Sequence, residues 1–170
     1  WLLSGTSPAT IPIAPATTRR IFDGLGADRD TIVAAYRKFV GEDADRLAAT
    51  IAADEFMGTG TRAEARLLAA AGIPVHAYRF AALPSPLRHL TWGAPHGTEI
   101  FYVFGTLAKM RGVGDRLTDE DRALSRAMID YWAAFAKTGS PTVAGLPVWP
   151  AYRRDDDRLM EFSDGGPAVT

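Results

Sequence analysis

Short apolar runs alternate along this chain with stretches of helical periodicity, and this alternation restricts the fold more than any other feature. The runs at residues 1–6, 73–80 and 159–162 have the length and composition of buried strands. Strands that alternate with amphipathic helices are typical of α/β proteins with a parallel sheet. Because only about three strands are recognisable, we expect a few strands of a mostly parallel sheet whose neighbouring strands are missing.

Two helices are predicted in the first third of the chain. Apolar residues recur every three or four positions over residues 29–40, and Gly41 then interrupts the pattern. A second helix is expected to start at Asp43 or Asp45, because either side chain can cap its first turn. The three prolines within residues 7–18 exclude a regular helix or a central strand there.

A third helix is expected within residues 58–72, which are rich in alanine. Thr59 or Thr61 is a candidate for its N-cap, and Gly72 is expected to end it. The strand predicted next, residues 73–80, has side chains that alternate between its two faces.

The longest helix is predicted between Thr118 and Gly139. Thr118 and Asp121 suit an N-cap, and Gly139 followed by Pro141 ends the pattern. One face is continuously apolar and consists of Leu124, Ala127, Met128, Tyr131, Trp132 and Phe135. We therefore expect this helix to pack against the core.

Composition excludes several classes of function. Of the 170 residues, 47% are hydrophobic and 23% are charged, which is ordinary for a globular protein. The formal net charge of -1 predicts no bulk attraction to nucleic acid or to an anionic membrane. The chain has no cysteine, so disulfides, thiolate zinc sites and a cysteine nucleophile are excluded, while the cellular compartment stays open. No apolar run approaches the ~18 residues of a membrane span.

The two ends of the sequence resemble interior segments. The chain starts at Trp1 with a strand-like run and no methionine, and it finishes at DGGPAVT without a terminal helix. We expect residues 1–170 to be a single partial domain cut from a longer protein.

Three histidines are the candidates for proton transfer. His76 lies within a predicted strand and His89 within a proline-rich loop, so structural roles are expected for both. His96 is different, because Pro95 precedes it and Gly97 follows it in a loop after a strand. Such loops carry catalytic groups in α/β folds. The residues alone leave two interpretations of His96 open, a proton-transfer group or a polar side chain at the edge of a core.

Four aromatic residues flank this histidine along the sequence: Trp92, Phe101, Tyr102 and Phe104. They are candidates to line a pocket for the acyl or alcohol group of a substrate. Aromatic residues that follow a turn are more often part of a core, and we favour that interpretation.

Four segments together resemble one protein family. Residues 96–105, HGTEIFYVFG, resemble the histidine motif of the type-B carboxylesterases, the cholinesterase-like branch of the α/β-hydrolases. Residues 53–80 resemble the segment of that family in which an Asp-x-x-Phe helix leads to a strand ending in Tyr-Arg-Phe. Residues 128–142 resemble its late helix, and residues 146–162 its closing Trp-Pro-x-Tyr stretch and final strand. The four segments keep the order of the family and cover nearly the whole chain.

The resemblance implies the C-terminal part of an α/β-hydrolase fold and a role for His96. It implies that His96 is the general base of a serine-hydrolase triad, taking the serine proton and returning it to the leaving alcohol. Imidazole suits both steps because it titrates near neutral pH. Glu99 would then support the polar surroundings of the histidine. Its alternative is a solvated carboxylate at a helix start, favoured by the helix dipole.

The nucleophile that such a triad needs is absent from the chain. The family places its serine in a Gly-x-Ser-x-Gly turn between a strand and a helix, and residues 1–170 contain no such pentapeptide. The glycine-rich oxyanion loop is also missing. In the family both features lie upstream of the segments matched here.

The residue that would serve as the acid of the triad is a separate question. The family places it in a stretch resembling Leu-x-Gly-Thr-Asn-x-x-Glu, and aligning residues 2–10 with that stretch puts Thr10 at the glutamate. Threonine accepts a hydrogen bond from imidazole but does not stabilise imidazolium by charge. Three interpretations of Thr10 at this position stay open: the acid is lost, another carboxylate such as Asp54 or Glu55 replaces it, or the segment is divergent or misregistered. Asp54 and Glu55 are more simply explained as the end of an amphipathic helix.

The sequence therefore predicts part of a serine carboxylic-ester hydrolase that supplies His96 but no nucleophile, and that is inactive alone. The expected partners are a small ester substrate and the missing N-terminal half of the domain. No cofactor, metal, nucleic acid or membrane span is expected. Two alternatives stay open. One is a non-catalytic relative used for binding or adhesion, which Thr10 motivates, and the other is an unrelated small α/β module that binds a partner through a sheet edge.

Overall fold

Four short strands form one mixed sheet in the structure, a computed structural model that describes residues 2–6, 15–90 and 93–170. The sheet runs β1-β2-β3-β4, with strands β1 (Leu2–Thr6), β2 (His76–Phe80), β3 (Met160–Ser163) and β4 (Gly166–Val169). Strands β1, β2 and β3 run parallel to one another, and β4 runs antiparallel to β3. All three predicted strands are therefore present, and their parallel arrangement is confirmed.

The fourth strand is a correction to the sequence-based prediction. Ser163 pairs with Gly166, so Asp164 and Gly165 form a two-residue hairpin loop between β3 and β4. The left-handed residue is neither of these two but Gly166, with φ 95°, as in hairpins where a glycine directly follows the turn. Asp164, Gly165 and Gly166 were the available signal, but Gly166 and Pro167, which belong to β4, concealed the strand.

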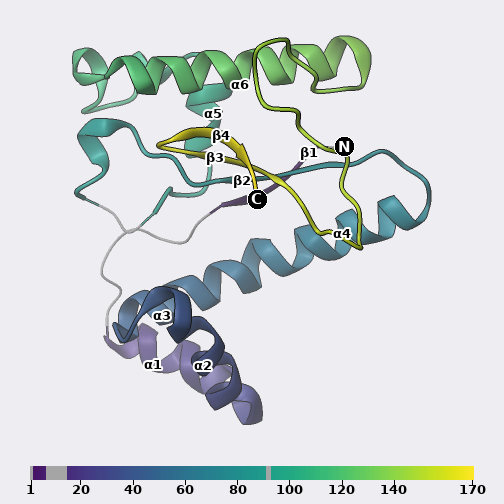
Figure 1. Cartoon of the computed structure of the whole chain (residues 1–170). Helices are drawn as coiled ribbons and strands as arrows, with labels where there is room; N and C mark the ends of the chain where they lie inside the picture. Colours follow the sequence, from purple (N-terminus) through teal and green to yellow (C-terminus); the bar gives the residue numbers. More distant parts are fainter. Residues whose placement is uncertain (1, 7–14, 91–92) are drawn as a thin grey trace.

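Helices cover both faces of the sheet (Figure 1). Helix α6 (Asp119–Thr138) lies along one face together with α5 (Thr98–Val103), and α4 (Thr59–Ala70) lies along the other. Three further helices gather beyond one end of α4: α1 (Pro15–Gly24), α2 (Arg29–Val40) and α3 (Ala44–Ala53). The remaining short elements are η1 (Gly26–Asp28), η2 (Asp54–Gly58), η3 (Ser85–Leu87), η4 (Leu107–Lys109) and η5 (Gly114–Arg116).

The alternation predicted for β2 divides the core into two clusters. Tyr78 and Phe80 belong to the larger cluster, whose members on α6 are Leu124, Met128 and Tyr131. Ala77 belongs to the smaller cluster, together with Ala65 of α4. Successive side chains of a strand point to opposite faces, so β2 contributes to both layers.

The longest helix has the predicted N-terminus and C-terminus. The Thr118 hydroxyl accepts from the backbone N–H of Asp121 at 3.3 Å, and the Asp121 carboxylate accepts from the backbone N–H of Thr118 at 3.0 Å. This reciprocal pair is a capping box. Gly139 adopts a left-handed conformation after the last turn, with φ 76°. Four of the six residues predicted for the apolar face are buried, and Trp132 and Phe135 are half-buried.

The expected N-cap of the third helix is a second correction. Helix α3 ends at Ala53 with Asp54 as its C-cap, as expected, but the chain stays helical because the π-helical segment η2 joins α3 and α4 into one continuous rod. The backbone N–H of Thr59 donates to the Asp54 carbonyl five residues earlier, so the start of α4 needs no side-chain cap. The Thr59 hydroxyl instead donates to the Glu55 carbonyl at 3.2 Å. The cap of α3 at Asp43 and the stop at Gly72 are confirmed.

Two expectations for the N-terminal helices also need correction. Helix α1 begins at Pro15, inside the segment from which prolines were expected to exclude a helix. Proline is tolerated in the first turn of a helix, where its missing N–H would have no partner. Pro8 and Pro12 lie outside the described residues. Helix α2 has its predicted bounds, but none of its residues is buried, and Phe39 is 89% exposed.

Among the described helices, none has an apolar stretch of the length needed to cross a bilayer.

Candidate active site

The loop that follows β2 carries His96. The loop leaves the sheet after Phe80 and ends in a tight turn, where the backbone N–H of Thr98 donates to the Pro95 carbonyl at 3.1 Å. Gly97 has φ 84°, in the left-handed region, and α5 begins directly after it. The glycine that marked this turn in the sequence is thus needed to place the histidine at the start of α5.

Replacing Gly97 by alanine is expected to destabilise the protein by about 1–2 kcal/mol, because an L side chain at this backbone conformation is strained. A new Cβ would meet only Ile100 Cδ1, at 3.8 Å, so strain rather than a clash accounts for the loss. Gly60 in α4 is the matched control, since its Cβ would meet nothing and alanine favours a helix. Urea unfolding should show opposite signs for the two variants, and equal effects would contradict the assignment.

His96 is exposed and lies beside an aromatic ring from another element. The ring of Phe56, in η2, stands edge-on to the imidazole, with 6.5 Å between ring centroids. The π segment therefore brings Phe56 to the histidine, although the two residues are forty positions apart in sequence. Phe56 is 76% exposed, so the surface beside the imidazole is open in this chain.

Glu99 is buried rather than solvated. Its relative exposure is 9%, and its Oε2 has no hydrogen-bond partner among the described residues. The solvated carboxylate expected as the simpler alternative is therefore wrong. A carboxylate withdrawn from water is costly unless polar groups compensate it; Glu99 Oε2 and the Tyr102 hydroxyl, both on α5, are buried polar atoms without a partner among the described residues.

The first half of the loop is anchored by two aspartates from different elements. Asp121 of α6 accepts from the backbone N–H of Ser85 at 3.1 Å with both oxygens, and Arg88 donates to it at 3.2 Å. Asp164 of the β3–β4 turn accepts from the backbone N–H of Leu83 at 3.0 Å and pairs with Arg88 at 2.9 Å. These contacts fix residues 83–88 against α6 and the hairpin. The sequence offered no signal for them, because the partners lie far apart along the chain.

The part of the chain that the structure describes pairs no acid with the histidine. Among the described residues, no carboxylate makes a hydrogen bond or ion pair with the His96 ring. Asp54 accepts instead from the Tyr36 hydroxyl at 2.7 Å, and Glu55 is exposed. Both directly follow the end of α3, as expected, and are the first residues of the π segment that continues the rod. Thr10 lies outside the described residues.

The aromatic residues near His96 divide between core and surface. Tyr102 is fully buried, and Phe101 packs against the larger core cluster, as the core interpretation predicted. Burial raises the pKa of the Tyr102 phenol, which stays protonated. Phe104 is 73% exposed and belongs to neither a core nor a described pocket. Trp92 lies outside the described residues.

The other two histidines lie where a structural role was predicted. His89 is exposed in the loop. His76 is buried in β2 between the rings of Phe135 and Trp149, and its Nδ1–H donates to the Pro150 carbonyl at 3.2 Å. Burial lowers the pKa of His76 from its ordinary value of 6.5, and the hydrogen bond to Pro150 opposes this only in part.

Acidification is therefore expected to destabilise the fold through His76. The unfolded chain takes up a proton near pH 6.5 that the folded histidine resists, so this contribution is fully present above that pH. It is lost as the pH falls from 6.5 toward the lowered pKa of the folded state. Urea unfolding at neutral and at mildly acidic pH measures the loss. The His76→Gln variant should lose less stability on acidification, and an unchanged pH dependence would contradict the prediction.

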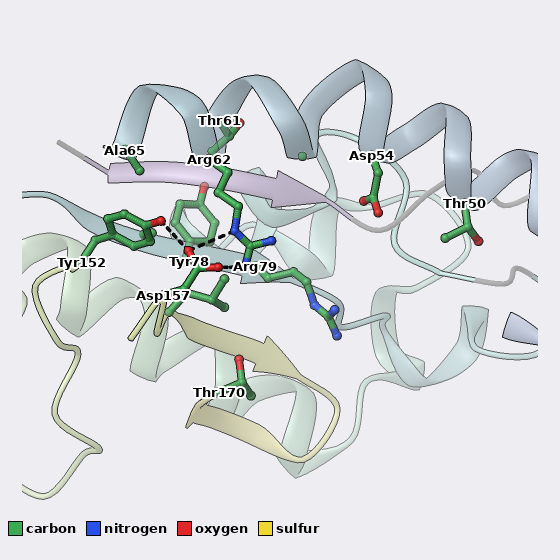
Figure 2. Close-up of a pocket in the computed structure, with 13 residues that line it drawn as sticks. Thr50, Asp54, Thr61, Arg62, Ala65, Tyr78, Arg79, Tyr152, Asp157 and Thr170 are labelled. Atoms are coloured by element: carbon green, nitrogen blue, oxygen red, sulfur yellow. Dashed lines mark hydrogen bonds and ion pairs between the residues drawn. The ribbon is translucent and has the colours of Figure 1, made fainter. Parts of the chain in front are cut away.

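A pocket lies elsewhere, between α4 and the sheet. It has a volume of about 360 Å³ and is lined by residues of α3, η2, α4, β2, the loop between α6 and β3, and the last residue, Thr170. Figure 2 shows Arg62 reaching from α4 to Asp157, beside Tyr152. Arg62 pairs with the Asp157 carboxylate at 2.6 Å, and the Tyr152 hydroxyl also donates to it. Although burial raises the pKa of Asp157, these hydrogen bonds lower it overall. The pocket does not include His96, and each of its charged groups already has a partner: Arg62 pairs with Asp157 inside it, whereas Arg79 pairs with Glu161 and Asp54 accepts from Tyr36, both outside it.

No group of three or more metal-binding side chains is brought together in the described part of the chain.

Comparisons with known proteins assign the family. Residues 29–168 match the carboxylesterase family. Carboxylesterase 5A of the dog, Canis lupus familiaris, is 41% identical over 95 residues, which are 52% of this chain and 16% of the relative. Carboxylesterase 1C of the rat, Rattus norvegicus, is 36% identical over 110 residues, which are 63% of this chain and 19% of the relative. The human cocaine esterase is 37% identical over 90 residues, which are 51% of this chain and 16% of the relative.

The chain thus spans less than a fifth of the length of these curated relatives. The match extends from α2 to β4 and includes His96. The resemblance found in four separate motifs is confirmed, and an unrelated small α/β module is excluded. The chain therefore belongs to the carboxylesterase family, in its type-B branch, and represents part of such a protein.

Proposed function

We propose that residues 1–170 form the C-terminal part of an α/β-hydrolase domain, and that the whole protein hydrolyses carboxylic esters through an acyl-serine intermediate. The supporting observation is the position of His96, exposed on a glycine turn after a parallel strand, with a buried carboxylate three residues later. Family membership makes a serine-hydrolase mechanism the natural use of such an imidazole.

In the proposed reaction, His96 moves one proton twice. A serine hydroxyl from outside residues 1–170 attacks the ester carbonyl carbon while the imidazole accepts the hydroxyl proton. The bond from that carbon to the alcohol oxygen then breaks, and His96 returns the proton to the leaving alcohol. Water attacks the acyl-serine by the same route, releasing the carboxylic acid and restoring the serine.

Glu99 acts in this proposal as a positioning residue. It lies in the first turn of α5, directly after the turn that holds the histidine. Helix α5 is itself held by α6, since the Ser125 hydroxyl donates to the Tyr102 carbonyl at 2.8 Å. From this position Glu99 would support the polar surroundings of the histidine.

Labelling with a fluorophosphonate tests the proposal directly. The reagent phosphonylates an activated serine and releases fluoride, and the natural polypeptide that contains residues 1–170 is the sample. We expect one labelled peptide, with its serine in a Gly-x-Ser-x-Gly turn outside these residues, together with hydrolysis of a short-chain p-nitrophenyl ester. A polypeptide with neither labelling nor turnover would contradict the ester-hydrolase proposal.

A non-catalytic binding protein is the second candidate. Two observations favour it: Thr10 aligns with the family's acid, and no carboxylate among the described residues pairs with His96. A threonine cannot supply the charge that stabilises imidazolium, and neutralising the acid costs about 10⁴ in turnover. The sequence upstream of Trp1 separates the candidates. An intact Gly-x-Ser-x-Gly turn supports the enzyme, and a replaced serine supports the binding protein.

A further inference from the structure

One arginine on the loop after β2 contacts three separate parts of the fold. The Nε–H of Arg88 donates to the Leu83 carbonyl at 3.1 Å, within the loop itself. Its Nη2 donates to Asp121, in the first turn of α6, at 3.2 Å, and its Nε lies 2.9 Å from Asp164 in the β3–β4 turn. A guanidinium presents its donors in one rigid plane, so it can hold two carboxylates and a carbonyl in fixed positions.

The two carboxylates that Arg88 contacts are the ones that hold the loop backbone. Asp164 accepts from the backbone N–H of Leu83 at 3.0 Å. Asp121 accepts from the backbone N–H of Ser85 with both oxygens, at 3.1 Å. Two carboxylates that share one guanidinium repel each other once it is removed, and the Asp121 side chain is only 1% exposed. The order of this part of the loop therefore depends on Arg88.

The same charges lie close to the helix that follows His96. Tyr102 is fully buried on α5, and burial raises the pKa of its phenol. The charges of Asp121 and Asp164 raise this pKa further, and that of Arg88 opposes them. Because His96 lies between Arg88 and α5 along the chain, both ends of its segment adjoin this cluster of charges.

The direction of the His96 ring depends on the backbone of its loop. The ring is exposed, and no carboxylate among the described residues pairs with it. Its aromatic neighbour, Phe56, is itself 76% exposed. A shift of the loop would therefore carry the imidazole with it, and a displacement of about 1 Å at a reacting group can lower a rate about 100-fold.

We infer that Arg88 is a positioning residue for His96, which holds the loop so that the imidazole meets the reacting serine. The inference rests on the proposed function and deepens it, because that reaction needs the ring at about 3 Å from the serine hydroxyl. Neither the family match nor the proposed reaction assigns Arg88 a role. Arg88 acts through the loop backbone and not through a contact with the reacting atoms.

Turnover per reactive serine tests this role in the Arg88→Ala variant of the natural polypeptide that contains residues 1–170. Labelling with a fluorophosphonate to completion counts the folded sites, and kcat for a short-chain p-nitrophenyl ester is divided by that count. We expect kcat per site to fall about 100-fold while KM changes by about threefold or less, because the imidazole is misplaced and the substrate contacts are kept. Fewer labelled sites with an unchanged kcat per site would show a structural role alone and overturn the inference.

Arg37→Ala is the matched control for the loss of an ion pair. Arg37, in α2, pairs with Glu42 at 2.9 Å, and its side chain is 49% exposed, against 38% for Arg88. Its removal should leave kcat per site within about twofold, as expected for an exposed pair. Equal losses in the two variants would contradict a specific role for Arg88.

Guanidinium added to the Arg88→Ala variant gives an independent measurement. The Arg88 side chain is more than a third exposed, so a small cation can enter the space that alanine leaves. Guanidinium chloride at about 20 mM should raise kcat per site about tenfold, because the planar cation reproduces the contacts of the side chain. Methylammonium chloride at the same concentration lacks this geometry and should not. Equal effects of the two salts would overturn the inference.

Failure of this inference can be told apart from failure of the proposed function. If the unaltered polypeptide neither reacts with the fluorophosphonate nor hydrolyses the ester, the ester-hydrolase proposal fails and the inference fails with it. If the unaltered polypeptide is active and Arg88→Ala keeps its kcat per site, only the role of Arg88 is lost.

Discussion

Under the proposed mechanism, replacing His96 by alanine is expected to lower ester turnover by the whole protein about 10⁴-fold or more, with little effect on substrate binding. Removing the histidine of a triad abolishes both proton transfers, and what activity persists comes from binding and oxyanion stabilisation. Because His96 is exposed, its loss should leave the fold intact. The measurement is kcat and KM for a short-chain p-nitrophenyl ester, together with the unfolding midpoint of each variant.

His89 provides the matched control for this variant. It is also exposed, and it lies on the same loop after β2, seven positions before His96. His89→Ala should leave kcat within a factor of two or so, since exposed substitutions away from a site have small effects. An unchanged rate in His96→Ala would remove this imidazole from the mechanism, and an equal loss in both variants would point to the loop as a whole.

Replacing Asp121 by alanine is expected to destabilise the protein by about 3 kcal/mol or more. The side chain is almost fully buried, and its oxygens accept from the backbone of Ser85, the backbone of Thr118 and the guanidinium of Arg88. Alanine would leave three donors without their acceptor and would also remove the capping box of α6. Each charge-assisted hydrogen bond contributes more than a neutral one, so this position should be among the most sensitive in the chain.

Asp119 is the control for that loss, because it is an acidic residue in the same first turn of α6 but is exposed. Asp119→Ala should lower the free energy of unfolding by only about 0.5 kcal/mol, from the lost dipole interaction. Denaturant titration of both variants gives the comparison. A loss below about 1 kcal/mol in Asp121→Ala would mean that water replaces the carboxylate, and that it does not anchor the loop.

The local sequence pattern was sufficient to predict the helices whose apolar periodicity extends over many residues. The bounds of α2 and the caps of α6 follow from periodicity and from Thr118, Asp121 and Gly139, because these features act within a few residues. The joint between α3 and α4 could not be foreseen in this way. Thr59 and Thr61 resemble caps, but the preceding turn already satisfies the backbone there.

In the candidate site too, local sequence predicts some features, and contacts between distant segments determine the others. The glycine turn places His96 at the start of a helix, as its neighbours in sequence suggested. The burial of Glu99 and the approach of Phe56 depend on packing between segments far apart in the chain. The anchoring of the loop by Asp121 and Asp164 joins residues 36 and 81 positions apart. No motif encodes such pairs, so only the folded arrangement reveals them.

The π-helical segment Asp54–Gly58 makes the neighbourhood of His96 sensitive to the number of residues in the rod. A π turn holds one residue more than an α turn, and each residue of an α-helix advances the chain by about 100° around its axis. Deleting a single position there would close the wide turn to a regular α turn, with α3 and α4 still in phase, and would replace the five-residue hydrogen bond from Thr59 to Asp54 by ordinary four-residue bonds. A one-codon deletion would therefore change the position of Phe56 beside the imidazole while the rod stays continuous.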